Sequence, residues 1–226
     1  MKRLYHWPLD PAGRLVRLAL GEKGEGFETL ESPPWSVHPD VTRLAHGAVA
    51  PALVEIESER EPQMFACGTR AICEYLEESA SGRALLPADP AARAETRRLW
   101  AWIEAACEEV TDTLLTERVM QWVRRDRHPD SARLRRGAHA LRGRLTFLNG
   151  MLEVNGYLAC RDLTLADLAA AAHLSAYDYF GDVEWNAVPE LKDWYARIKS
   201  RPSFRPLLAD RLEAVRPVAH YADLDF

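Results

Sequence analysis

Side chains that can exchange a proton gather around the first turn of the chain, in the stretch YHWPLDPAG. Tyr5 and His6 could each donate a hydrogen bond to an anion, whereas an ionised Asp10 would repel it. Because neighbouring strand residues point to opposite faces, at most one of Tyr5 and His6 can face a given site. The alternative is that Asp10 caps the following helix while Tyr5 and His6 pack in the core.

Other kinds of reactive site have no matching pattern in the sequence. The four cysteines form no CxxC pair, and the seven histidines add no zinc-ligand spacing, so we expect reduced thiols and no bound metal. There is neither a glycine-rich phosphate loop nor a GxSxG turn. A net charge of −5 argues against nucleic acid as the main partner, because phosphate binding favours a basic surface.

The composition indicates a globular protein of the cytoplasm. The chain has 226 residues, and 47% of them are hydrophobic, which is enough for one large domain or two small ones. No apolar segment follows the basic start MKRLYHWPLD, and no run of 18 apolar residues occurs anywhere. We therefore expect neither a signal peptide nor a membrane span.

Strands and helices alternate in the first 80 residues. The patterns KRLYHW and FETLES predict two strands, with a helix from Arg14 to Lys23 between them that ends at Gly24. A loop, the strands APALVEIE and QMFAC, and the helix TRAICEYLEES follow. This order, βαβ and then ββα, predicts a thioredoxin-like domain over residues 1–80.

The rest of the chain is predicted to be helical. Small residues, Gly82 and two prolines interrupt the periodicity over residues 81–90, where we expect a linker. Residues 91–226 then predict an all-helical domain with an extended tail, including one long helix or two over 94–126 and another helix over 131–154. In LTLADLAAAAHL, Thr164 and Asp167 have the spacing of a capping box. The fold class is therefore an α/β domain followed by an all-α domain.

Five marks in this order resemble the glutathione S-transferase fold: DPAGRLVRLALGEKG, VAPALV, TRAICEYL, LTLADLAAAAHL and WYARIKSRPSF. The resemblance covers nearly the whole chain and implies a homodimer. It implies a cis peptide bond before Pro51, with the backbone of Ala50 presented to an extended γ-glutamyl peptide. It also implies that the Thr69 hydroxyl and the first amides of its helix would hold the γ-glutamyl carboxylate. Glutathione is the one cofactor this suggests, although we expect none.

The thiol activator is the first departure from the family's pattern. The family places a Ser, Cys or Tyr donor at the end of the first strand to lower the pKa of the glutathione thiol, which is near 8.5 when free. Depending on register, the matching positions here are His6, Asp10, Ala12 or Gly13. None of them carries a hydroxyl or a thiol, so we expect no transferase chemistry unless His6 or a bound water assists.

The second departure lies in ACGTRAI. The family usually has an acid before the Ser or Thr, and that acid binds the ammonium of the γ-glutamyl group. Here Gly68 stands in its place, so the ammonium loses its charge partner. Thr69 keeps the hydroxyl, but it could equally be the N-cap of its own helix.

A narrower resemblance gives the leading functional hypothesis. The opening LYHWPLDPAGRLVRLAL and the ending from Tyr179 onward are similar to the glutathione S-transferase-like cell-division proteins of alphaproteobacteria, which bind FtsZ. This resemblance implies a non-catalytic module that binds FtsZ filaments, in the cytoplasm at the division site. The alternative is a glutathione transferase that conjugates or reduces small electrophiles.

Two features could anchor a partner. Trp35 lies in the proline-stiffened loop SPPWSVHPD, where it could be a contact residue, or it could pack under its loop or line the rim of the peptide site. The tail AHYADLDF could fray, or it could dock, because Tyr221 and Phe226 are costly to leave in water. The narrower resemblance favours partner contact through Asp223.

The stretch RRDRHPDSARLRR, residues 124–136, is the one strong basic cluster of the sequence. It connects two predicted helices. We interpret it as a solvated loop with local pairing to Asp126 and Asp130, or as a contact for an acidic partner segment. It has no interleaved aromatic residues, so single-stranded nucleic acid is not expected.

Overall fold

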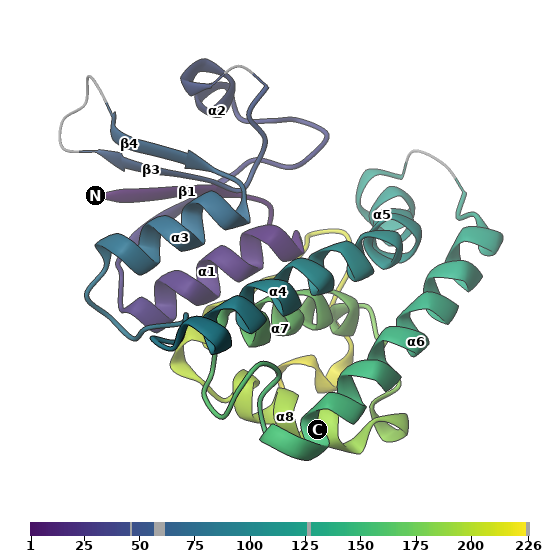
Figure 1. The fold of residues 1–226 in the computed structure, drawn as a ribbon. Helices are drawn as coiled ribbons and strands as arrows, with labels where there is room; N and C mark the ends of the chain where they lie inside the picture. The colour runs from purple at the N-terminus through teal and green to yellow at the C-terminus, as the bar shows by residue number, and fades with distance from the viewer. Residues whose placement is uncertain (46, 57–61, 126–127, 225–226) are drawn as a thin grey trace. The chain divides into compact units, whose positions relative to one another are not determined.

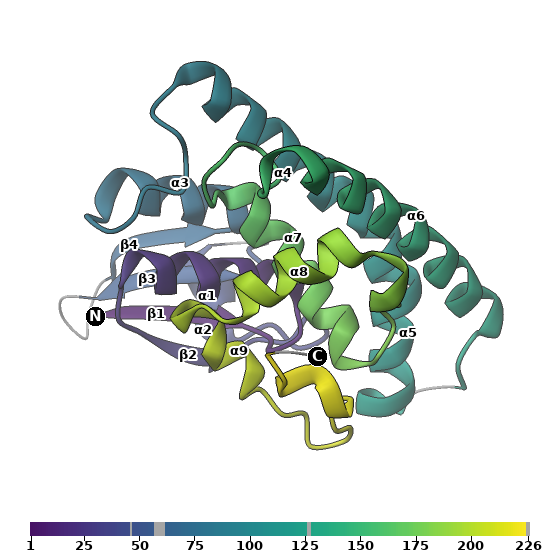
Figure 2. The ribbon, with the colours of Figure 1, turned by 90° about the horizontal axis from the view of Figure 1, so that it is seen from below.

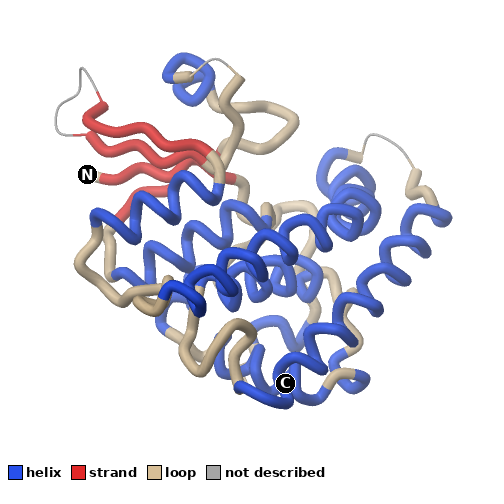
Figure 3. Tube along the Cα trace, viewed as in Figure 1, coloured by secondary structure: helices blue, strands red, loops and turns tan. Residues whose placement is uncertain are grey.

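The structure, a computed structural model, describes residues 1–45, 47–56, 62–125 and 128–224 of the chain. The chain forms two compact units, residues 1–85 and 86–226 (Figures 1 and 3). The division falls inside the stretch 81–90 where the helical periodicity breaks down.

The first unit is built on a four-stranded mixed sheet with the order β2-β1-β3-β4 (Figure 3). Its strands are β1 (Lys2–His6), β2 (Phe27–Glu31), β3 (Ala52–Ile56) and β4 (Pro62–Cys67). β1 runs parallel to β2 and antiparallel to β3, and β3 is antiparallel to β4. The four predicted strands and the βαβ–ββα order are confirmed.

Helices cover both faces of this sheet. α1 (Pro11–Lys23) and α3 (Thr69–Ser79) contact each other on one face, and α2 (Pro39–Leu44) lies on the other (Figure 1). α1 ends as predicted, at Gly24 in the left-handed conformation with φ +72°. The prediction of a loop between β2 and β3 was wrong for α2. This helix is short, with Pro39 at its first turn and the His38 ring accepting a hydrogen bond from the Asp40 amide.

The second unit consists of helices. The segment 90–124 is continuous, with two π-helical turns inserted: α4 (Pro90–Val110), η1 (Thr111–Leu115), α5 (Thr116–Val119) and η2 (Met120–Arg124). The other elements are α6 (Ser131–Asn155), α7 (Leu165–Tyr179), η3 (Trp185–Ala187), α8 (Pro189–Lys199), η4 (Pro202–Phe204), α9 (Arg205–Leu208) and η5 (Ala219–Ala222). Within the described part of the chain, no helix combines the length and the apolar content needed to cross a bilayer.

α7 is the central helix of this unit, with α4, α6 and α8 around it (Figure 2). All of its side chains are buried except that of His173, which is half-buried. The capping box at its start is confirmed, because the Thr164 amide donates to Asp167 Oδ2 at 2.9 Å. The Thr164 hydroxyl donates to the same oxygen, while Oδ1 accepts from the Leu158 amide and the Trp194 indole at 2.9 and 3.1 Å. The buried Asp167 carboxylate therefore connects the segments that contain Leu158, Thr164 and Trp194.

Candidate functional site

The end of β1 separates the two possible donors, as the alternation of strand residues predicted. Tyr5 lies on the α2 face, in the core that includes Val41, and its hydroxyl donates to Asp40 Oδ2 at 3.1 Å. His6 is buried on the opposite face against α1, where Gly13 leaves room for it. A Cβ atom on Gly13 would lie 2.8 Å from His6 Cβ. His6 is thus enclosed beside the first turn of α1.

Asp10 caps α1, which confirms the structural alternative for this residue. Its Oδ1 accepts from the Ala12 amide at 3.3 Å and its Oδ2 from the Gly13 amide at 3.0 Å. Burial raises the pKa of the Asp10 carboxyl to about 6, against the opposing effects of those two amides and of the charge on Arg14. Both oxygens of Asp10 are therefore engaged at the helix N-terminus, and the group is largely ionised at neutral pH.

Arg14 is a charged side chain of this turn that the sequence analysis did not single out. It is fully buried, and its Nε donates to the Pro8 carbonyl at 2.7 Å. The only sequence signal was its place four residues after Asp10, in a helix whose neighbouring positions are mostly apolar. Its positive charge acts to lower the pKa of the Asp10 carboxyl.

The three residues implied to hold a γ-glutamyl peptide come together at one edge of the first unit. The expected cis peptide bond joins Ala50 and Pro51. The Pro51 carbonyl accepts from the Gly68 amide at 2.9 Å, which brings this bond next to the start of α3, where Thr69 lies. The cis bond and the start of α3 therefore lie next to each other in the structure.

Gly68 is the N-cap of α3, with φ +83° and ψ 151° and no side-chain cap. Thr69 is the first helical residue, so the alternative that Thr69 is the N-cap was wrong. A Cβ atom on Gly68 would meet no atom within 4 Å, so the missing side chain leaves open space. An acid at this position would have room, but it would have to adopt a backbone conformation that L-residues rarely adopt.

Trp35 packs on the end of β1 while staying half-exposed. Its ring meets the Trp7 ring edge-on, with centroids 5.2 Å apart and an interplanar angle of 67°. Its loop is closed by hydrogen bonds from the Ser36 amide to the Pro33 carbonyl at 2.9 Å and from the His38 amide to Ser32 Oγ at 3.0 Å. A half-exposed indole on an ordered loop suits a contact residue.

The tail docks on the second unit, and the alternative of a frayed end was wrong through residue 224. Tyr221 is fully buried, its ring meets that of Tyr179 edge-on at 5.2 Å, and its hydroxyl donates to the Leu207 carbonyl at 3.1 Å. Asp223 follows at the exposed end of η5. The other predicted anchor, Phe226, lies outside the described residues together with residue 225.

A buried polar network beneath this tail was missed by the sequence analysis. Asp178 is fully buried, and His220 Nε2 lies 2.9 Å from its Oδ1. The Trp185 indole donates to the same oxygen at 2.7 Å, and Lys199 Nζ donates to the His220 carbonyl at 3.2 Å. Burial lowers the pKa of Lys199 to about 8, although Asp178 and Asp223 act to raise it. The sequence signal for this network was an acidic residue, Asp178, within the apolar run LSAYDYF.

The basic stretch 124–136 makes local ion pairs. Arg133 contacts Asp112 at 3.0 Å and Glu117 at 3.5 Å. Asp130 caps α6, and the amides of residues 133 and 132, with the nearby arginines, lower its pKa. The expected pairing to Asp126 lies outside the described residues.

Both units of the chain match known protein families. Residues 4–84 match the family described as glutathione S-transferase, N-terminal domain, and residues 113–202 match glutathione S-transferase, C-terminal domain. The chain belongs to the glutathione S-transferase family. The resemblance found in the five sequence marks is confirmed, and so is the predicted fold.

Among the similar proteins, some are named for FtsZ and others are named as glutathione S-transferases. FtsZ-localized protein A of Caulobacter vibrioides is 46% identical over 226 residues, which cover 100% of this chain and 98% of that protein. The structure of FzlA from C. crescentus matches with a TM-score of 0.93 and 46% identity, covering 100% and 99% of the two chains. A glutathione S-transferase from Rhodospirillum rubrum F11 matches with a TM-score of 0.93 and 41% identity over 100% of both chains.

Proposed function

We propose that this family member is a non-catalytic module that binds FtsZ filaments in bacterial cell division. The observation that carries the proposal is the 46% identity with FtsZ-localized protein A along the whole chain. In the proposal the protein acts as a homodimer in the cytoplasm, at the division site. Its glutathione S-transferase fold then serves as a scaffold for contacts with the filament.

The first turn supports the absence of transferase chemistry. Lowering a thiol pKa by about two units requires about 2.7 kcal/mol of preferential stabilisation of the thiolate. An ionised Asp10 acts in the opposite direction, because like charges disfavour each other. Gly68 offers no charge to the glutathione ammonium, and an unpaired desolvated ammonium costs a few kcal/mol.

Two surface residues, the half-buried Trp35 and the exposed Asp223, are the proposed filament contacts. Trp35 presents a half-exposed indole on an ordered loop, which gives contact area at a low entropic cost. Asp223 is exposed, and the burial of Tyr221 two residues earlier fixes its position on the second unit. Both contacts are therefore pre-organised for a partner.

Charge reversal at Asp223 tests the proposal. In co-sedimentation with GTP-assembled FtsZ, Asp223→Lys is expected to weaken binding about tenfold, since a like-charge contact replaces an attractive one. Trp35→Ala should weaken binding by at least about tenfold, as is usual for a central aromatic contact. Asp162→Lys is the matched control, because Asp162 is also an exposed aspartate of the second unit. Wild-type protein that stays in the supernatant, or equal pelleting of Asp223→Lys and wild type, would contradict the proposal.

A glutathione transferase is the second candidate. The cis Ala50–Pro51 bond beside Thr69 favours it, and so does the 41% identity with a protein named as a transferase. This candidate predicts millimolar or tighter glutathione binding in calorimetry, about tenfold weaker for Thr69→Val because a hydrogen bond to a charged carboxylate is lost. The absence of binding heat at high glutathione concentration would exclude it and leave the filament proposal intact.

A further inference from the structure

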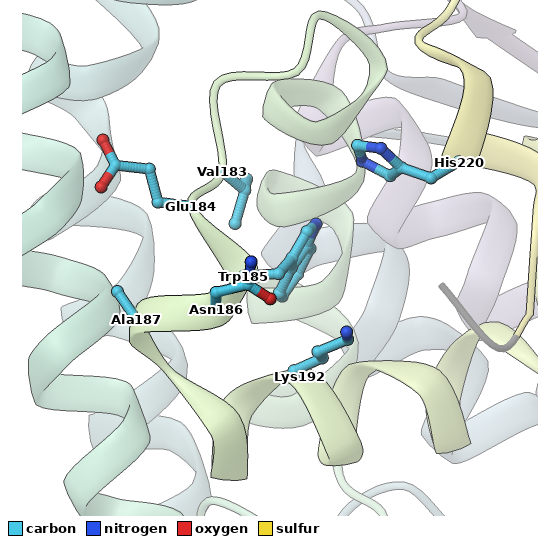
Figure 4. A pocket seen from close by; sticks show the side chains of 7 residues that line it. All are labelled: Val183, Glu184, Trp185, Asn186, Ala187, Lys192 and His220. Atoms are coloured by element: carbon cyan, nitrogen blue, oxygen red, sulfur yellow. The ribbon is translucent and has the colours of Figure 1, made fainter.

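The second unit contains a pocket of about 680 Å³ that the proposed function does not use (Figure 4). It lies between η3, the first turn of α8 and η5 of the tail. Its walls are formed by the indole of Trp185, the imidazole of His220 and the polar side chains of Asn186, Lys192 and Glu184. Trp185 is only 6% exposed, so the pocket combines a small exposed part of its side chain with groups that can bind a charged ligand.

A single buried carboxylate positions two of these walls. Asp178 Oδ1 accepts from Trp185 Nε1 at 2.7 Å and is 2.9 Å from His220 Nε2. The contact between His220 Nε2 and Asp178 Oδ1 therefore fixes the orientation of the imidazole that lines the pocket. Tyr195 stacks on the Trp185 ring with centroids 4.7 Å apart, so the indole is held from two directions.

The charges of the lining favour a negative ligand. Lys192 and His220 point towards Trp185 from different sides, whereas Glu184 points away from them (Figure 4). Glu184 is also 3.5 Å from Arg142 Nη1, which offsets its charge. Lys192 is therefore the cationic lining group turned towards the indole, while the Asp178 carboxylate contacts both the indole and the imidazole.

We propose that this pocket binds a small aromatic carboxylate. The ligand's ring packs against the Trp185 indole, and its carboxylate accepts from Lys192 Nζ and the Asn186 amide.

Binding at this pocket is coupled to the tail, because His220 belongs to η5. The His220 carbonyl accepts a hydrogen bond from Lys199 Nζ, and its ring contacts the Asp178 carboxylate. A ligand against the ring adds a third contact to this residue. The Val218 amide donates to the Tyr179 carbonyl at 3.2 Å, and the Tyr221 amide to the Val218 carbonyl at 3.0 Å. These two amides should exchange hydrogen more slowly when the ligand is bound.

The Trp185 indole N–H resonance gives a direct test. Benzoate is titrated into the ¹⁵N-labelled full chain, and Trp185→Phe assigns the signal. We expect a saturable shift with benzoate and at least about tenfold weaker binding of uncharged benzamide. Equal binding of benzamide, or no saturable shift with benzoate, would overturn the proposal. Tighter binding of inorganic phosphate than of benzoate would also overturn it.

Substitution of Lys192 locates the ligand. Lys192→Met should weaken benzoate binding about tenfold, because one charge-assisted contact is lost. Arg161→Met removes an equal charge from an exposed position outside the pocket lining and should leave the affinity unchanged. Lys192 is a half-buried side chain near the start of α8, and circular dichroism checks that both variants fold. Equal affinities of the two variants would place benzoate elsewhere.

Discussion

Replacement of Asp167 by alanine is expected to destabilise the helical unit by about 4–5 kcal/mol, at the high end of single-substitution effects. Its carboxylate accepts four hydrogen bonds, from the Thr164 amide and hydroxyl, the Leu158 amide and the Trp194 indole. Alanine would leave these buried donors without an acceptor, and each unsatisfied group costs about 1–3 kcal/mol. Denaturant unfolding followed by tryptophan fluorescence measures the loss, because Trp194 is fully buried in this unit.

An exposed cap provides the comparison for Asp167. Asp89 caps α4 by accepting from the Ala92 amide at 2.8 Å, at an exposed position. Asp89→Ala should cost only about 1 kcal/mol, as is typical of an N-cap that water can partly replace. If the two substitutions cost the same, the buried network contributes nothing beyond an ordinary helix cap, and the prediction is wrong.

Alanine at Gly82 is expected to destabilise the first unit by about 3 kcal/mol, within the range for overpacking. A Cβ atom there would lie 2.1 Å from the Lys23 carbonyl oxygen and 2.6 Å from the Lys23 Cα. These are backbone atoms, so no side-chain rotation can relieve the contact, and the segment after α3 must move. That segment is tied down, because Glu77 contacts Lys23 Nζ at 2.7 Å and accepts from the Leu85 amide at 3.0 Å.

Gly143 is the control position for the Gly82→Ala substitution. It lies exposed within α6, and a Cβ atom there would meet nothing within 4 Å. Gly143→Ala should stabilise the protein by about 0.5–1 kcal/mol, because alanine loses less backbone entropy in a helix. The measurement is chemical denaturation of both variants. A loss for Gly82→Ala below about 1 kcal/mol would show that the segment after α3 adapts freely.

Features that depend on residues a few positions apart could be predicted from the sequence. The Asp10 cap and the Thr164–Asp167 box follow from short side chains reaching the nearest free amides. The further partners of Asp167 could not be predicted, since Trp194 is 27 positions away in the sequence. The Asp178–His220 contact spans 42 positions and depends on where the tail docks. Long-range polar contacts follow from the tertiary packing, which local patterns do not specify.

The candidate peptide site was predicted only in part, because some of its contacts also depend on tertiary packing. Strand alternation was enough to place Tyr5 and His6 on opposite faces, and the family's pattern was enough to expect the cis bond at Pro51. The burial of Arg14 and the close approach of Gly13 to His6 depend on how α1 lies on the sheet. The short helix α2 was missed because six residues give too little periodicity to recognise.

The backbone conformation of Gly68 also has a consequence for the stability of the first unit. A residue other than glycine held at a φ of +83° stores about 1–3 kcal/mol of strain, which proteins commonly retain at functional sites. With glycine here, the start of α3 keeps its shape without that strain. Glycine at position 68 therefore stabilises the start of α3 relative to an acid at the same position.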